Sequence, residues 1–281
     1  MKTINDNDND NDIKKILLEN SNITKNIEND EEIEKYMEMY NINLSENTKC
    51  YSKNTFDLNK FMDTYPVISG MTSKNKIYGI IYHLKQLIDN NIDGDIVELG
   101  CNIGTTSIFI QKFLEEYGSN KKLYCYDSPE GLPEIHEKDK NIYANRFNTG
   151  DLKFNENTFL KVFENFNLSL PVHKFISFRK IDDSMLPSKI SMAFFDGVFY
   201  NNIMTSFDIV FDKISKHGII IVDDVGSNET ILDIDNPYPG AEYAIIDFLK
   251  NCKETYTYDG YPNEQFIFDD IPHGGAKIEK L

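Results

Sequence analysis

The sequence predicts an α/β protein built on a doubly wound, parallel sheet. Short apolar runs alternate along the chain with longer amphipathic segments, the order in which strands and helices follow one another in such sheets. Two of the runs, 190–195 and 218–222, are largely apolar and too short for helices, as is typical of strands buried on both faces. Seven strands are expected, ending at Gly100, Asp127, Arg179, Asp196, Asp223, near Tyr258 and near Asp269. Helices are expected over residues 77–90, 105–117, 157–165, 203–215 and 242–251.

The first 65 residues differ in composition from the rest, so we place the sheet domain at 66–281. Residues 5–12 alternate Asn and Asp, a run that cannot pack, and 1–12 is therefore predicted to be a disordered tail. Short amphipathic patterns within 13–65 predict a helical N-terminal extension. We expect this extension to cover the active site as a lid or to form part of a homodimer contact.

Charge and cysteine content exclude several classes of function. The chain has 29 basic and 46 acidic residues, a net charge of −17, which argues against a nucleic-acid partner and against docking on anionic lipid. Its four cysteines are widely spaced, without a C-x-x-C pair, and indicate reduced thiols. The sequence shows neither a signal peptide nor a run long enough to cross a membrane. We expect a cytoplasmic protein that acts on a small molecule.

Three acids stand at the ends of two buried strands. Asp196 closes 190–195, and Asp223 and Asp224 close 218–222. If the two strands are neighbours, about 4.8 Å apart, the three carboxylates converge and make an oxygen-only site suited to Mg²⁺. The alternative, strongest for Asp224, is that acids follow a buried strand because the chain there emerges into water.

A second candidate site lies at the turn after the strand that runs into Glu98. Gly100 and Gly104 leave room for a ligand against the backbone. The helix that begins after Gly104 offers hydroxyls and free N–H groups to an anionic group; its first residues are Thr105, Thr106 and Ser107. The spacing E-x-G-x-x-x-G resembles motif I of S-adenosylmethionine-dependent methyltransferases, although any strand–glycine–helix turn has some likeness to it.

The strand that ends at Asp127 strengthens the nucleotide-ligand interpretation. One carboxylate at that position can accept hydrogen bonds from both ribose hydroxyls. Residues 127–133, D-S-P-E-G-L-P, closely resemble the D-S-F-E-G-L-P segment of the macrocin/mycinamicin-type O-methyltransferases, which methylate sugar hydroxyls. Ser128 lies in this segment and is expected at the cofactor.

The resemblance to this family extends in order over roughly residues 66–270. Further similar segments are G-D-I-V-E-L-G at 94–100, M-T-S at 71–73, M-L-P at 185–187, D-G-V-F-Y at 196–200, I-V-D-D at 221–224 and 239–248. The family implies a seven-stranded Rossmann-like methyltransferase sheet, a segment with Met71 and Thr72 folded over S-adenosylmethionine, and Mg²⁺ held by the acids matching Asp196, Asp223 and Asp224. One residue departs from the pattern: Val198 replaces the second acid of the family's D-G-D.

Three further side chains are weaker candidates. His136 lies in the polar loop after the D-S-P-E-G-L-P segment and is either a base near the substrate or a solvated loop histidine. Asp182 and Asp183 follow the expected third strand, where this fold often contacts the adenine amino group, and a helix cap explains them equally well.

The mechanism that these residues predict is in-line methyl transfer from S-adenosylmethionine to a sugar hydroxyl. Mg²⁺ chelated by two adjacent sugar oxygens would acidify the hydroxyl, and Asp196, which borders the cofactor, or His136 would take the proton. Two alternatives stay open. One is a catechol-type O-methyltransferase, and the other is a catalytically silent protein that keeps the fold and the cofactor.

Overall fold

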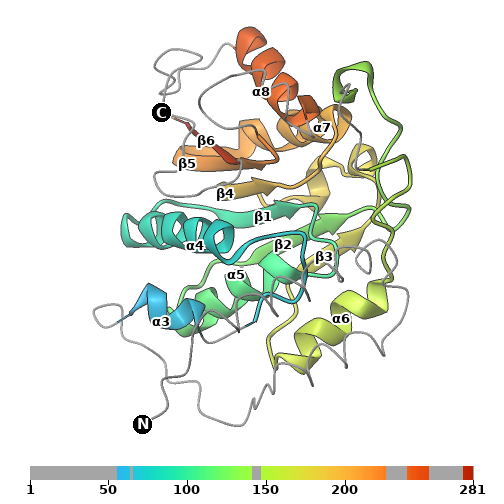
Figure 1. The fold of residues 1–281 in the computed structure, drawn as a ribbon. Coiled ribbons are helices and arrows are strands. Elements are labelled where there is room, and N and C mark those ends of the chain that lie inside the picture. The colour runs from blue at the N-terminus through green and yellow to red at the C-terminus, as the bar shows by residue number, and fades with distance from the viewer. Residues whose placement is uncertain (1–55, 64–65, 141–146, 226–238, 253–274, 281) are drawn as a thin grey trace, which may run out of the picture.

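The computed structural model describes residues 56–63, 66–140, 147–225, 239–252 and 275–280. Within them the centre of the fold is one six-stranded sheet with the order β3-β2-β1-β4-β5-β6 (Figure 1). The first five strands are parallel, and β6 pairs antiparallel with β5. The strands are β1 (Asp95–Leu99), β2 (Leu123–Asp127), β3 (Val172–Phe175), β4 (Ile190–Phe195), β5 (Ile214–Asp223) and β6 (Gly275–Glu279).

The strand order reverses at β1, which pairs with β2 on one side and β4 on the other. Ligands of open α/β sheets bind beyond the carboxyl ends of the strands at such a reversal. In β1, Leu99 is in register with Tyr126 of β2 and Phe195 of β4. The residues that follow these positions therefore meet at one edge, which is where the sequence places both candidate sites.

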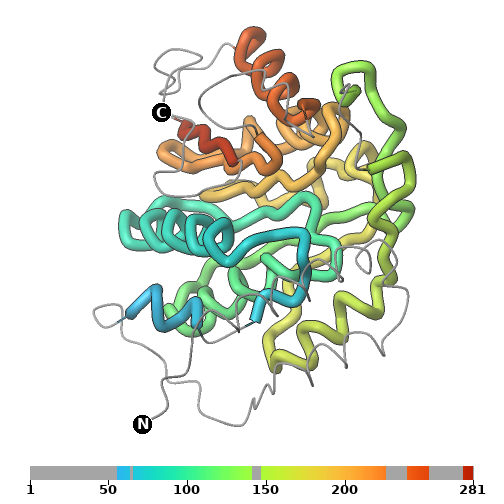
Figure 2. Tube along the Cα trace, viewed as in Figure 1, coloured from blue at the N-terminus to red at the C-terminus, as the bar shows by residue number. Residues whose placement is uncertain are grey.

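Helices cover the two faces of the sheet separately (Figure 2). One face carries α3 (Leu58–Met62), α4 (Lys74–Asp89), α5 (Thr105–Glu116) and α6 (Glu156–Asn165), whose apolar sides pack into a single cluster. The other face carries α7 (Tyr200–Val210) and α8 (Pro239–Asn251). Short 3-10 turns complete the connections at 137–139, 178–180, 183–185 and 211–213.

Side chains of the central strands alternate between these two faces, because successive strand residues point to opposite sides. In β5, Ile219 and Ile221 belong to the α4–α5 cluster, whereas Ile220 and Val222 belong to the α7–α8 cluster. The same alternation directs the next residue, Asp223, toward α4. The position of a residue along its strand thus decides which helix its side chain meets.

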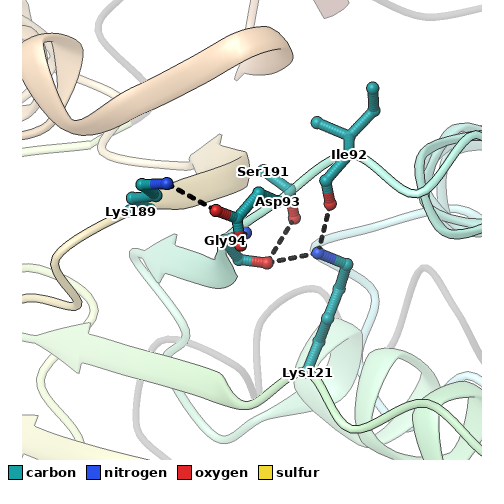
Figure 3. A network of polar contacts seen from close by, with 6 residues as sticks. All are labelled: Ile92, Asp93, Gly94, Lys121, Lys189 and Ser191. Carbon is teal, nitrogen blue, oxygen red and sulfur yellow. Dashed lines mark hydrogen bonds and ion pairs between the residues drawn. The ribbon is translucent and has the colours of Figure 1, made fainter.

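The amino end of β1 is anchored to its neighbours by polar contacts (Figure 3). Lys121 Nζ donates to Ile92 O at 2.6 Å and also to Gly94 O, while Ser191 Oγ donates to Gly94 O at 3.0 Å. Gly94 has φ +105°, and a Cβ there would lie 2.7 Å from Ile190 N. Close packing of β1 against β4 therefore requires glycine at the start of the G-D-I-V-E-L-G segment.

Several expectations need correction against the structure. The third strand is expected to end at Arg179, but β3 ends at Phe175 and residues 178–180 form a 3-10 turn, since only 172–175 pair with β2. Five of the seven expected strands are present as β1 to β5. The two strands expected near 258 and 269 lie outside the described residues, and β6 was not expected from the sequence. The helix expected over 203–215 begins at Tyr200 and ends at Val210, because β5 already starts at Ile214.

The predicted extension is described only in part. Residues 1–55, which include the tail and the amphipathic patterns, lie outside the described residues. The later segment forms α3, and its Phe61 and Met62 are buried in the same core as α4 and α5. This end of the extension therefore packs as part of the sheet domain. Among the helices that the structure describes, none is long and apolar enough to cross a membrane.

Candidate active site at the carboxyl edge of the sheet

The carboxylate of Glu98 lies on the α5 side of β1, near its carboxyl end. It is 1% exposed, and its Oε2 accepts a hydrogen bond from Ser107 Oγ at 2.5 Å. Cys125 Sγ of β2 lies 3.7 Å from the same oxygen. Burial raises the pKa of Glu98 to about 7, although the bond from Ser107 acts in the opposite direction. The structure thus brings together two predicted cofactor residues, Glu98 and Ser107.

The glycine turn between β1 and α5 makes a tight passage. Gly100 has φ +106°, and a Cβ there would lie 1.9 Å from Asp196 O, so no other residue fits. Gly104, with φ +90°, precedes α5 and supplies no side-chain cap, which leaves the first N–H groups of α5 for a ligand. Within the described part of the chain, the buried hydroxyls of Thr105 and Thr72 have no hydrogen-bond partner. Unpartnered buried hydroxyls at a helix start are what a polar ligand would satisfy.

Asp127 ends β2 directly beside this turn. Its Oδ2 accepts from Asn102 N at 2.5 Å, and its Oδ1 accepts from Ser128 N at 2.6 Å. Burial raises the pKa of Asp127 to about 7 against the effect of these two bonds. Each oxygen keeps a lone pair for a further donor, such as a ribose hydroxyl. Together with the unpartnered threonines, this chemistry fits S-adenosylmethionine, and the residues present would hold it at this edge.

The three acids predicted as a metal site follow the two strands beyond β1. Phe195 of β4 is in register with Val222 of β5, so Asp196 and Asp223 are neighbours across the strand ends. Burial first, and then the charges of Asp223 and Asp224, raise the pKa of Asp196 well above its usual value. Burial and Asp223 raise the pKa of Asp224 to about 7. The three carboxylates are therefore close enough for their charges to act on one another.

A lysine that the sequence did not single out lies among these acids. Lys76, in the first turn of α4, places its Nζ 2.5 Å from Asp223 Oδ1, and the side chains are 14% and 3% exposed. The same Oδ1 accepts from Asp224 N at 2.7 Å. Burial alone would lower the pKa of Lys76, but the charges of the surrounding acids, foremost Asp223, raise it above its usual value. The ammonium is therefore charged and faces the whole cluster.

The donor set of this cluster suits a hard cation, but its arrangement does not. Among the residues that the structure describes, no three His, Cys, Asp or Glu side chains are grouped so that they could hold a metal ion. Asp223 Oδ1 is already bound by an ammonium and a backbone N–H. As arranged, these residues do not fit a bound Mg²⁺.

Val198, which replaces the family's second acid, belongs to a small apolar cluster. It is 4% exposed and packs with Leu132, Phe147 and Phe199. Its φ is +60°, and Phe199 N donates to Gly197 O at 2.6 Å, which closes a strained γ-turn around a β-branched residue. The apolar surroundings would penalise an acid at this position.

His136 is held by its own loop and by α7. Its Nδ1 accepts from Lys138 N at 3.2 Å, and its ring stacks on Tyr200 at a centroid distance of 4.5 Å. With the Nδ1 lone pair engaged, the neutral ring carries its proton on Nε2. Asp139 ties the same loop to α7 by accepting from Tyr200 N at 2.6 Å. His136 is therefore an ordered loop residue beside α7, and its role as a base stays a prediction.

Three further predicted residues, Met71, Asp182 and Asp183, are exposed, whereas Thr106 is buried. Asp182 Oδ1 accepts from Ser184 N at 2.9 Å, which makes it the cap that the sequence allowed as an alternative. Asp183 pairs with Lys213 at 2.6 Å with 89% of its side chain exposed. Met71 is 38% exposed. Contact of these three residues with a cofactor stays a prediction.

Sequence reasoning missed Lys76, although a signal for it exists. Lys76 shares one helical stripe with Ile80, Leu84 and Leu87, which are buried, because residues four, eight and eleven positions apart lie on the same face. A lysine on the apolar stripe of a helix must meet a partner in the interior. The partner itself lies 147 positions later by sequence number and is visible only in the fold.

The doubly wound sheet, with a glycine turn at β1 and an acid at the end of β2, defines a methyltransferase-like nucleotide-binding protein. A family model described as macrocin O-methyltransferase (TylF) matches residues 11–242. The chain therefore belongs to the macrocin O-methyltransferase family, which confirms the resemblance seen in the sequence.

The chain is also similar to one curated relative and to two solved structures of methyltransferases. The 4'-O-methyltransferase of 8-demethyl-8-(2,3-dimethoxy-alpha-L-rhamnosyl)-tetracenomycin C from Streptomyces olivaceus is 23% identical over 161 residues, which cover 55% of this chain and 61% of that relative. The O-methyltransferase NovP superposes with a TM-score of 0.57 at 16% identity, over 89% of this chain and 97% of NovP. The calicheamicin methyltransferase CalS11 gives 0.57 at 14% identity, over 90% and 93%. These two likenesses concern the fold.

Proposed function

We propose that the protein transfers a methyl group from S-adenosylmethionine to a hydroxyl of a sugar, in a deoxysugar, nucleotide-sugar or glycan. The observation that carries the proposal is that two groups lie together at one edge of the sheet. One is the proposed cofactor site, formed by Glu98, the glycine turn and Asp127, and the other is the carboxylate of Asp196. Asp196 N donates to Leu99 O at 2.8 Å, so the acid directly borders the turn that would hold the cofactor. Family membership and the rhamnosyl-directed relative support a sugar as the acceptor.

The cofactor supplies an electrophilic methyl group on a positively charged sulfur. The acceptor oxygen donates an electron pair to form the new O–CH₃ bond, the S–CH₃ bond breaks, and its electron pair stays on the sulfur as S-adenosylhomocysteine forms. The hydroxyl proton passes to a base. The chain orients the cofactor. Asp127 would accept hydrogen bonds from the ribose hydroxyls, and the first N–H groups of α5 and the hydroxyl of Thr105 would form hydrogen bonds with its polar groups.

Asp196 is the base that we favour, because it lies nearest the cofactor turn of the candidate acids. His136 is the second candidate, and its engaged Nδ1 makes it a better hydrogen-bond donor than a base. The Mg²⁺ dependence expected from the sequence rests on the three acids and the family alone, so no step proposed here passes through a metal. Homodimer formation through the N-terminal extension likewise stays a prediction.

The test is a panel of acceptors assayed side by side. The full-length protein is incubated with S-adenosylmethionine and nucleotide-sugars, free deoxysugars, glycosides or catechol. Formation of S-adenosylhomocysteine and the mass gain of one methylene group are both followed. We expect turnover with sugar hydroxyls that is lost in Asp196→Asn while S-adenosylhomocysteine binding persists. Turnover with catechol alone would replace the sugar assignment, and cofactor binding without any methylation would favour a silent protein.

A further inference from the structure

The acid cluster contains a positive charge that belongs to the chain itself. Lys76 approaches from α4, and Asp223 projects from β5 toward the same helix, which is why their side chains meet. At 3% exposure, Asp223 has lost nearly all contact with water, and a buried carboxylate needs a partner of opposite charge. Lys76 is that partner, at 2.5 Å.

This pairing differs from an ordinary buried ion pair elsewhere in the fold. Lys112 and Glu116 pair at 3.1 Å within α5, one turn apart, and both are nearly buried. Lys76 instead reaches across from a helix to the strand ends, where its charge acts on Asp223, Asp224 and Asp196 together. The charge of one ammonium thus interacts with three acids near the cofactor turn.

The position of Lys76 opposes a second cation at the same acids. A divalent ion bound to Asp223 would lie within a few ångströms of the ammonium, where repulsion between their charges is strong. At Oδ1 of Asp223 it would also have to replace either Lys76 Nζ or Asp224 N. Mg²⁺ requires near-octahedral oxygen geometry, which an oxygen shared with an ammonium does not provide.

We propose that Lys76 is the resident cation of the Asp196–Asp223–Asp224 cluster, and that a divalent cation binds these acids only when the charge of Lys76 is removed. The chain then supplies internally the positive charge that the cluster requires. This inference goes beyond the proposed function and holds for any methyl acceptor, because it concerns cation binding at the acids.

Calorimetric titration with Mg²⁺ tests the proposal on three full-length proteins. Lys76→Met keeps an unbranched side chain of nearly the same length and removes its charge. Lys74→Met is the matched control, because Lys74 also pairs with an acid, Asp63, but the two side chains are 49% and 73% exposed. We expect Lys76→Met to bind Mg²⁺ about tenfold or more tightly than the wild type, whereas Lys74→Met matches the wild type.

Three outcomes would overturn the proposal: wild-type protein binding Mg²⁺ as tightly as Lys76→Met, tighter binding by the wild type, or absence of binding in both. The charge-conserving Lys76→Arg provides a second arm, with Mg²⁺ affinity expected to stay at the wild-type level.

If Lys76→Met unfolds in metal-free buffer, circular dichroism during Mg²⁺ addition replaces calorimetry. Recovery of the native signal then supports the proposal, and its failure to recover overturns it. Because cation binding is read without any acceptor, failure here is distinct from failure of the sugar assignment.

Discussion

Two halves of the same sheet edge stabilise their buried acids in different ways. At the ends of β1 and β2, Glu98 accepts from a hydroxyl and Asp127 accepts from two backbone N–H groups, all uncharged donors. At the ends of β4 and β5, Asp223 accepts from the ammonium of Lys76. Uncharged donors orient a carboxylate and leave its charge for a ligand, whereas a buried ammonium cancels it.

This contrast separates the two tasks of the edge. The β1–β2 half keeps acceptor capacity, as recognition of hydroxyls in a ribose requires. The β4–β5 half holds a balanced charge cluster next to the turn, with Asp196 as the member closest to it. Each half can be disturbed alone, since its partners come from different helices, α5 for Glu98 and α4 for Asp223.

The largest effect is expected from removing the internal cation. Lys76→Met leaves Asp223 buried without its counter-charge, and the free energy of unfolding in metal-free buffer should fall by about 3–5 kcal/mol. Urea unfolding followed by circular dichroism measures it. Lys74→Met, in the same helix but exposed, should change it by less than about 1 kcal/mol. Equal small losses in both variants would mean that Lys76 is not the counter-charge of a buried acid.

The next effect concerns the other half. Asp127→Ala should weaken S-adenosylhomocysteine binding by about 1.5–3 kcal/mol, the value of hydrogen bonds to a charged group, as measured by calorimetry. Asp93→Ala is the control, because Asp93 pairs with Lys189 at the opposite end of the sheet. Unchanged affinity in Asp127→Ala would show that Asp127 does not bind the ribose. The inferences about the acids at the ends of β4 and β5 would not depend on that result.

A further effect should appear as a pH dependence of stability. Burial raises the pKa values of Glu98 and Asp127 from their usual values near 4 to about 7. The folded protein therefore binds more protons than the unfolded chain in this window, and the free energy of unfolding should fall as the pH rises from 5 to about 7. Urea unfolding across this range measures the slope. In Glu98→Gln the slope should be shallower, and an equally steep slope would contradict the role of Glu98.

The smallest effect tests the γ-turn next to the acid cluster. At most positions Gly is less stable than Ala, but the positive φ of Val198 favours glycine. Val198→Ala should cost about 1–2 kcal/mol of buried apolar contact, and Val198→Gly should cost no more than that. Val97, in the middle of β1, is the control, where Gly should be clearly worse than Ala. Thermal unfolding measures the stability of all four variants. If the Gly variant is clearly less stable than the Ala variant at position 198 as well as at position 97, the backbone at Val198 is not strained.

Patterns local in sequence determined much of this protein. The alternation of short apolar runs and amphipathic helices predicted the doubly wound class. The strands expected to end at Asp127 and Asp223 end there, and β4 ends at Phe195, one residue before the expected Asp196. The glycine turn and the family segments were sufficient to indicate the family and the cofactor edge. These features depend on residues that are neighbours in the chain, where spacing and side-chain type suffice.

Only the tertiary structure decided which charges meet. The early end of β3 at Phe175 depends on pairing with β2, and the presence of β6 depends on pairing with β5. Lys76 reaches Asp223 because α4 crosses the face to which β5 directs that side chain. Val198 is buried against Leu132, from a loop far away in the sequence. Such contacts join distant segments, and the free energy that selects them is gained only when those segments pack together.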